Sequence, residues 1–258
     1  MNLAVTYFLW FISYSILGWF YETILCSVMQ RKFINRGFLN GPYCPIYGSG
    51  ALLVITLLGR ITNPLILFLV SAVVTCALEY LTSYVMEKLF HARWWDYSNR
   101  PLNINGRVCL LGAIVFGAFS VLLVLLVHPA VCKLTDKIPL IIRYIMAVVL
   151  CLALLFDCIS TVLALSNFQK KIEYIASLLE EKRHSTAEKL RSSAIHNALQ
   201  RRKSSLVDLL SCQQKRIILA FPKLKLHRYN DLLTELREAL EKRHKAQDDQ
   251  KSKKDNGR

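Results

Sequence analysis

The segment from Gly37 to Gly50 constrains the fold of this chain more than any other feature. It lies between two long apolar runs and holds four of the ten glycines and two of the seven prolines. Glycine and proline disfavour regular helix, so we predict irregular backbone here, marked by Gly37, Gly41, Pro42, Pro45, Gly48 and Gly50. At membrane depth such backbone is tolerated only where protein buries it or where it lines a wet cavity. The segment therefore predicts an irregular element at one face of a membrane helix bundle.

Composition divides the chain into two unlike parts. It is 53% hydrophobic with a net charge of +15; residues 1–165 hold 11 Lys/Arg and 6 Asp/Glu, and residues 166–258 hold 22 and 12. A helix that crosses a bilayer needs about 20 apolar residues. Five runs approach that length: Ala4–Val28, Ile46–Leu58, Pro64–Met86, Val108–Val127 and Pro139–Leu165. We expect an all-α fold, with a polytopic membrane helix bundle over residues 1–165 and irregular segments on its cytoplasmic side.

The second run is short, and it forms either a span or half of a re-entrant pair. Cationic residues alternate between the loops as the positive-inside rule requires, and removing this run would break the alternation. That observation favours a span. The first loop, the third loop and the tail are the basic segments, with Arg31, Lys32, Arg36, Lys88, Arg93, Arg100 and Arg107 in the two loops. We therefore expect the N-terminus outside and the C-terminus in the cytoplasm.

The last third of the chain is expected to be helical and basic. Residues 166–243 are predicted as cytoplasmic amphipathic helices, because Phe168, Ile172 and Ile175 recur at helical spacing, and residues 244–258 as a disordered basic tail. These helices either form a partner-binding coiled coil or pack on the membrane surface or on each other. The second alternative is favoured because the heptads are not sustained. No second globular core is expected, and no nucleic acid, because acids are interleaved with the bases.

Three carboxylates lie inside apolar runs. Glu22, Glu79 and Asp157 are six, seven and eight residues from the expected cytoplasmic ends of their helices. At about 1.5 Å per residue, the three fall within a few Å of one level. An acid in a membrane normally faces the bundle interior or water. The spacing therefore predicts a ring of acids in the inner half of the bilayer.

Arg36 and Arg107 are the candidate partners of these acids. Arg36 precedes the glycine-rich segment, and Arg107 precedes the fourth run. Arginine can bridge carboxylates with two hydrogen bonds, so we expect both loops to fold back and place guanidinium groups over the acids. Two interpretations stay open. The ion pairs either fix helix packing only, or they line a polar cavity for a cation, a proton or a small polar substrate.

A second irregular segment follows the third run. Trp94 is expected to anchor in the headgroup layer, as aromatic residues at this depth often do. Trp95, Asp96 and Tyr97, followed by Asn105 and Gly106, form a polar, turn-rich stretch. We expect this stretch to return towards the membrane and to line the same cavity entrance as the glycine-rich segment.

Several kinds of chemistry have no sequence support. No GxxxxGK[ST], HExxH, GxSxG or kinase pattern occurs, and no CxxC pair occurs among the eight cysteines. We therefore expect no catalytic residues, no metal site and no cofactor, and we do not expect an enzyme. An intramembrane enzyme acting on lipid is a weaker alternative.

Two stretches carry a family resemblance: Phe33–Ala51, and Trp95–Ser98 with Asn105–Leu110, preceded by Gly18, Trp19 and Glu22. Over roughly residues 5–165 the chain resembles a bacterial family of CmpB-like permeases described as putative ABC-transporter type IV. The resemblance implies a multi-pass protein of the bacterial inner membrane that works with a separate ATPase. Five spans are few for a permease, which suggests a homo-oligomer. The alternative is a non-transporting scaffold or regulator that recruits partners through its tail.

Overall fold

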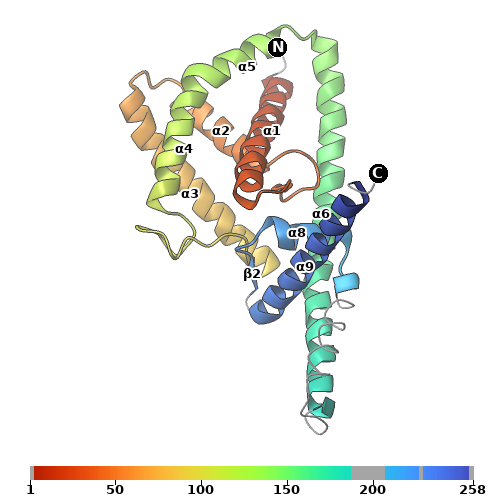
Figure 1. Ribbon diagram of the computed structural model, residues 1–258. Coiled ribbons are helices and arrows are strands. Elements are labelled where there is room, and N and C mark those ends of the chain that lie inside the picture. Colours follow the sequence, from red (N-terminus) through yellow and green to blue (C-terminus); the bar gives the residue numbers. More distant parts are fainter. Residues whose placement is uncertain (1–2, 187–206, 227–228, 256–258) are drawn as a thin grey trace.

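The computed structural model describes residues 3–186, 207–226 and 229–255, and it confirms an all-α membrane bundle (Figure 1). Two short strands accompany the helices. In chain order the elements are α1 (Leu3–Gln30), α2 (Pro45–Leu58), α3 (Pro64–Phe90), β1 (Ala92–Arg93), α4 (Leu110–Leu122), η1 (Leu123–Val127), α5 (His128–Asp136), α6 (Leu140–Thr186), α8 (Cys212–Ala220), β2 (Lys225–Leu226) and α9 (Asn230–Asp255).

The outer surfaces of the long helices are apolar. Among the described residues, four helical spans are long and apolar enough to cross a membrane, and α2 is a shorter apolar helix of 14 residues. Large apolar side chains stay exposed on them, such as Val73 on α3 and Ile141 and Phe156 on α6, at 71%, 71% and 76%. A soluble protein rarely exposes so much contiguous apolar surface, whereas lipid accommodates it. The chain is a membrane protein.

The structure corrects the prediction for the second half of the glycine-rich segment. Residues 37–44 are irregular, but Pro45 begins α2, and Gly48 and Gly50 lie inside this helix. Proline fits the first turn of a helix because an N–H group there has no intrahelical partner. The glycine content therefore placed the end of the irregular backbone too late, whereas the predicted apolar run Ile46–Leu58 locates the helix to within one residue.

Two glycines bring α1 and α2 into close contact. A Cβ atom at Gly48 would collide with the side chain of Ser15 and with the carbonyl of Phe11, both on α1. A Cβ atom at Gly18 would likewise collide with the ring of Tyr47 on α2. Small residues that let helix backbones approach are typical of membrane bundles. Packing, rather than backbone freedom, explains Gly48.

The fourth span is longer than the sequence predicts. It was expected to end at Val127, but η1 and α5 carry the helix on to Asp136. Pro129 removes one backbone donor, and the wider π-helical turn of η1 lies directly before it. The helix therefore continues past the proline instead of ending there.

The predicted domain boundaries do not coincide with breaks in structure. Helix α6 runs through residue 165 as one element of 47 residues, and Figure 1 shows it extending beyond the bundle. Helix α9 continues to Asp255, where we expected disorder from residue 244. Its last part is rich in Lys and Gln, which favour helix. The helix expected around residues 190–199 lies outside the described residues.

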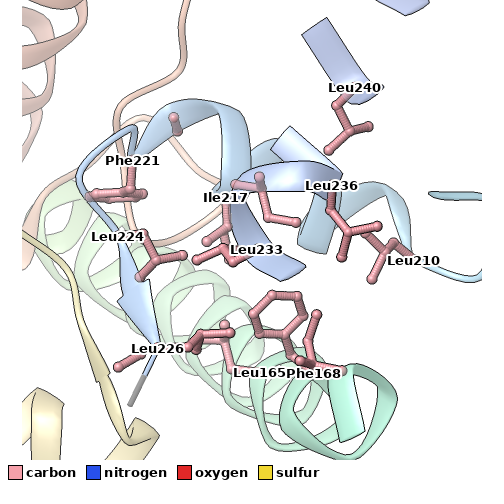
Figure 2. Close-up of a cluster of buried hydrophobic side chains, with 14 of the residues drawn as sticks. Leu165, Phe168, Leu210, Ile217, Phe221, Leu224, Leu226, Leu233, Leu236 and Leu240 are labelled. Carbon is pink, nitrogen blue, oxygen red and sulfur yellow. The ribbon is translucent and has the colours of Figure 1, made fainter. Parts of the chain in front are cut away.

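The tail helices pack on each other, which is part of the favoured alternative, but they also build a hydrophobic core, which we did not expect. Figure 2 shows side chains of α6, α8, β2 and α9 packed together, and loop residues of the bundle join them. Members of this cluster that are nearly inaccessible include Ile172, Ile175, Val207, Ile217, Ile218 and Leu233. We call the end of the bundle covered by this core the tail-side end. The amphipathic faces of the tail are buried here because several short helices together complete a core that none could form alone.

Trp94 belongs to this core. The prediction that it anchors in a headgroup layer is therefore wrong. Its side chain is only 3% exposed. The rings of Phe38, Phe90 and Phe221 surround it at centroid distances of 4.9, 6.0 and 5.2 Å. The aromatic cluster therefore joins the first loop, the end of α3 and the tail.

We predict that Gly48→Ala lowers the stability of the protein, whereas Gly50→Ala does not. The methyl group at residue 48 would overpack the α1–α2 crossing, at a cost of about 1–3 kcal/mol. At residue 50 the nearest atom to a new Cβ, on Leu78, is 3.4 Å away, which is an ordinary contact. Thermal unfolding in detergent measures the difference. Equal unfolding temperatures for the two variants would contradict the close crossing.

Candidate functional site

Asp157 on α6 holds the irregular backbone of residues 37–44. Its Oδ1 accepts hydrogen bonds from the backbone N and the Nδ2 of Asn40, at 3.0 and 2.9 Å. Its Oδ2 accepts from the backbone N of Gly41 at 2.7 Å and from the hydroxyl of Tyr43 at 2.8 Å. Asp157 thus satisfies donors that lipid cannot satisfy.

Two arginines connect this loop to the tail, one from the tail and one from the first loop. Arg216 on α8 donates from Nη1 to the carbonyl of Gly37 at 2.7 Å and from Nη2 to that of Phe38 at 3.1 Å. Arg36 donates in return to the carbonyl of Ala220, and its guanidinium lies 4.4 Å from the ring centre of Phe221. The loop and the tail therefore hold each other in place.

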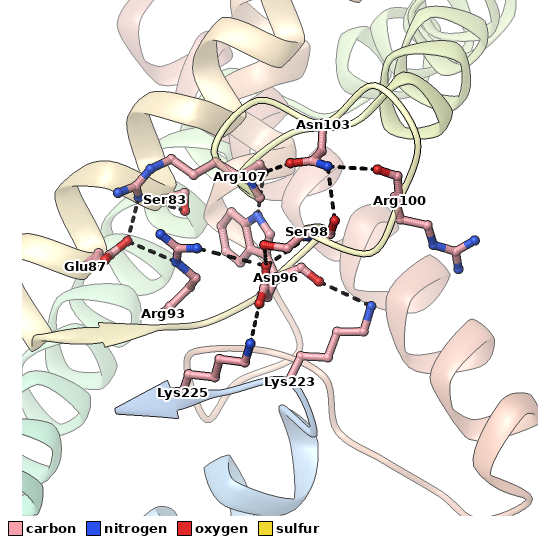
Figure 3. A network of polar contacts seen from close by, with 12 residues as sticks. Ser83, Glu87, Arg93, Asp96, Ser98, Arg100, Asn103, Arg107, Lys223 and Lys225 are labelled. Atoms are coloured by element: carbon pink, nitrogen blue, oxygen red, sulfur yellow. Dashed lines mark hydrogen bonds and ion pairs between the residues drawn. The ribbon is translucent and has the colours of Figure 1, made fainter. Parts of the chain in front are cut away.

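The structure gives Arg107 a partner that the sequence analysis missed. Its Nη1 lies 2.8 Å from Oε2 of Glu87 and 3.2 Å from the hydroxyl of Ser83 (Figure 3). The same Glu87 oxygen lies 3.3 Å from Nε of Arg93. The prediction that Arg107 lies over the predicted ring of acids is wrong. The four-residue spacing of Glu79, Ser83 and Glu87 on one helix face was the signal that could have revealed Glu87.

The second irregular segment folds through a tight turn at Asn105 and Gly106. Their φ angles are +52° and +66°, values that asparagine and glycine tolerate best. The indole of Trp95 donates to the carbonyl of Arg107 at 2.9 Å, and the backbone N of Tyr97 donates to that of Gly106 at 2.8 Å. The turn thereby returns the chain to the start of α4.

Asp96 ties this segment to the tail. Its Oδ1 accepts from the backbone N and hydroxyl of Ser98 at 2.9 and 2.5 Å, and its Oδ2 lies 2.5 Å from Nζ of Lys225 (Figure 3). Burial opposes ionisation of this carboxyl, but the bonds from Lys225 and Ser98 outweigh it and hold the pKa of Asp96 below its usual range. Beside this pair, β1 and β2 align antiparallel, with Ala92 opposite Leu226.

A cavity of about 640 Å³ lies among α1, α2, α3 and the α4–η1 helix, and Phe221 of the tail contributes to its wall. Glu22, Arg36 and Glu79 line it, and Asp157 does not. The predicted ring of three acids is therefore wrong, since Asp157 is used by the loop. Four of the residues that we predicted from the two irregular segments line the cavity: Pro45, Gly50, Trp95 and Tyr97. The other predicted residues of these segments do not line it: Gly37, Gly41, Pro42, Gly48, Asp96, Asn105 and Gly106.

The two cavity acids differ in their partners. Glu22 accepts a hydrogen bond from the hydroxyl of Tyr47 at 2.7 Å, and its other oxygen lies 3.7 Å from Nε of Arg36. Glu79 is only 6% exposed, and its Oε2 has no hydrogen-bond partner within the described part of the chain. The hydroxyl of Tyr97 lies beside the Glu79 carboxyl group. Leaving a buried carboxylate oxygen without a hydrogen-bond donor costs about 1–3 kcal/mol of folding free energy or more. A donor that reached this oxygen would therefore bind favourably.

Within residues 3–186, 207–226 and 229–255, no group of three His, Cys, Asp or Glu side chains is placed to hold a metal ion.

A comparison with protein families matches residues 9–162 to the model described as "Putative ABC-transporter type IV". The match covers more than half of the chain and includes both irregular segments and the cavity acids. Searches of curated proteins and of solved structures find no match.

We predict that Asp157→Asn loosens the first loop. The substitution removes the charge and turns one acceptor into a donor that faces other donors, which costs about 2–4 kcal/mol, on the scale of one or two charge-assisted hydrogen bonds. Amide hydrogen exchange should increase at residues 38–44. Glu22→Gln is the matched control, because its amide oxygen can still accept from Tyr47. Unchanged exchange in Asp157→Asn would refute the role of this side chain.

We predict that the Asp96–Lys225 pair stabilises the tail down to mildly acidic pH. A carboxyl whose folded-state pKa is lowered gives stability above its unfolded pKa of about 4, and that stability is lost as pH falls through the folded value. Between pH 7 and 5, exchange protection at residues 224–226, corrected for intrinsic rates, should stay constant. Asp96→Asn should reduce it throughout, whereas Asp208→Asn, in an exposed pair with Arg243, should not. A loss of protection in the unmodified protein by pH 5 would contradict this.

Proposed function

Since this chain belongs to the family described as Putative ABC-transporter type IV, we propose that it is the membrane-spanning, permease-like subunit of a transporter. The observation that carries the proposal is the cavity of about 640 Å³, which contains a buried acid with an unpartnered oxygen. Its volume is in the range of small-molecule sites, about 300–1,000 Å³. An intramembrane ionisable group at such a place typically marks a substrate or ion pathway.

The arrangement of the tail favours a transporter over a scaffold. A scaffold that recruits partners through a coiled coil needs an apolar helix face that is free to bind. In α9 the apolar stripe of Leu233, Leu236 and Leu240 is at most 4% exposed. These side chains pack in the core shared with α6 and α8. The tail therefore packs against the membrane bundle of the same chain, and its Phe221 lines the cavity.

We also propose an energy source, from the motifs of the sequence, and an orientation in the membrane, from its charge distribution. The sequence has no P-loop motif, so ATP would be hydrolysed by a separate subunit. The basic loops lie at the tail-side end, which by the positive-inside rule is the cytoplasmic face of a bacterial inner membrane. Because the described part of the chain has four long spans and one shorter apolar helix, we further propose that two or more copies assemble. We assign the chain no catalytic role of its own.

Cysteine accessibility tests the transport proposal. In a background in which the native cysteines are replaced, Thr82→Cys and Ser120→Cys would place thiols in the cavity wall. A membrane-impermeant maleimide should label both from either side of the membrane, because a transporter opens its cavity alternately. Val73→Cys, on the lipid-facing side of α3, is the control and should stay unlabelled. If neither cavity thiol is labelled from either side, the transport proposal fails.

Purification in mild detergent tests the energy source. We expect a separate ATPase to be retained, identified by mass spectrometry, and to hydrolyse ATP in the purified complex. Arg107→Gln, which would remove one of the two arginines that contact Glu87 beside the tail-side loops, is expected to weaken this association. A preparation that moves solute in vesicles without an ATPase would refute ATP dependence and leave the transport role intact.

A further inference from the structure

The acidic and basic groups that line the cavity leave one acid without a basic partner. They are Glu22, Glu79 and Arg36, two acids and one base. Arg36 is occupied by Glu22, by the carbonyl of Ala220 and by the face of Phe221. Glu79 is thereby left as the acid with no base beside it among the residues that line this cavity. A ligand that enters gains most if it brings one positive charge or one donor to Glu79.

Aromatic rings form the wall next to the cavity acids. Tyr21 packs edge to face against Phe119 with ring centres 4.8 Å apart. Tyr47 packs against Phe116 at 6.0 Å, and Tyr21 and Tyr47 lie 6.3 Å apart. All four side chains line the cavity. The faces of aromatic rings attract cations, and organic cations with low hydration most of all, which is how quaternary ammonium groups are recognised.

The rest of the wall is long and mostly apolar, with hydroxyl groups only at Ser49, Thr75, Thr82 and Ser120 besides the tyrosines. Glu79 Oε2 lies near Gly112 on α4, and the cavity continues along this helix to Leu123 and Val127 of η1. Fifteen residues separate Gly112 from Val127, about 22 Å at about 1.5 Å per residue. A small hydrated ion would leave this wall without a partner. A lipophilic anion would fill it but would meet the charge of Glu79.

We propose that the cavity binds a lipophilic organic cation, with a single positive charge opposite Glu79 and an apolar or aromatic body along α4 and η1. This inference rests on the proposed transport function, since it names the class of solute that the cavity accepts. The aromatic wall and Glu79 act together: the rings take the apolar body out of water, and the carboxylate selects the sign of the charge.

Two ions of nearly the same size and shape test the inference. Tetraphenylphosphonium is cationic, and tetraphenylborate is anionic. Equilibrium binding of each to the purified full chain in detergent should show at least tenfold tighter binding of the cation. Glu79→Gln should weaken binding of the cation at least tenfold and leave that of the anion unchanged. Glu79→Asp should retain the preference for the cation, and it keeps the test valid if the glutamine variant unfolds.

Asp136→Asn is the control for loss of a carboxylate. Asp136 lies at the opposite end of the bundle, its side chain is 67% exposed, and it pairs with Arg143. This variant should bind both ions as the unmodified protein does. Equal affinity for the two ions, or full cation affinity in a folded Glu79→Gln variant, would overturn the inference.

The outcome is separable from that of the transport proposal. Selective cation binding with a cavity thiol that stays closed to both sides would leave a cation-binding membrane protein that does not transport. Two-sided labelling of the cavity with no preference between the ions would keep the transporter and remove the cation as its class of solute.

Discussion

The hydrogen bonds from residues 40–43 to Asp157 are the interaction on which the rest of the structure depends. Non-helical backbone inside a membrane needs acceptors and donors from protein, because lipid offers none. Asp157 supplies the acceptors, and Arg216 supplies donors for the carbonyls of the same loop. With the loop fixed, Pro45 can begin α2 beside α1, and Tyr47 can reach Glu22.

The tail-side end couples the loop, the tail and the cavity. Arg36 contacts Glu22 in the cavity and also Ala220 and Phe221 in the tail. A displacement of the tail would therefore change the surroundings of Glu22 and remove Phe221 from the cavity wall. In a transporter, such a linkage gives a partner at this face a direct way to alter the cavity. The Asp96–Lys225 pair adds a second attachment of the tail at the neighbouring loop.

Much of the bundle could be predicted from local patterns, because apolar run length decides which segments cross a membrane. The irregular backbone of residues 37–44 and the approach of Arg36 to Glu22 also agree with that analysis. The partners of Asp157 and Arg107 did not follow from the sequence. A carboxylate in a helix has the same pattern whether it meets an arginine, as Glu87 does, or backbone N–H groups, as Asp157 does. The tail core was missed because its apolar residues are spread over several short segments.

The sequence by itself determined that this is a helical membrane protein, that its irregular segments interrupt the bundle at one end, and that acids lie within its helices. These properties depend on composition and on periodicity along one segment at a time. Only the tertiary structure decided which acid supports a loop, which is paired and which is left with a free oxygen. Those roles depend on contacts between segments far apart in the chain, such as Asp157 and Asn40, which are 117 residues apart, and on small residues such as Gly48 that let two particular helices meet.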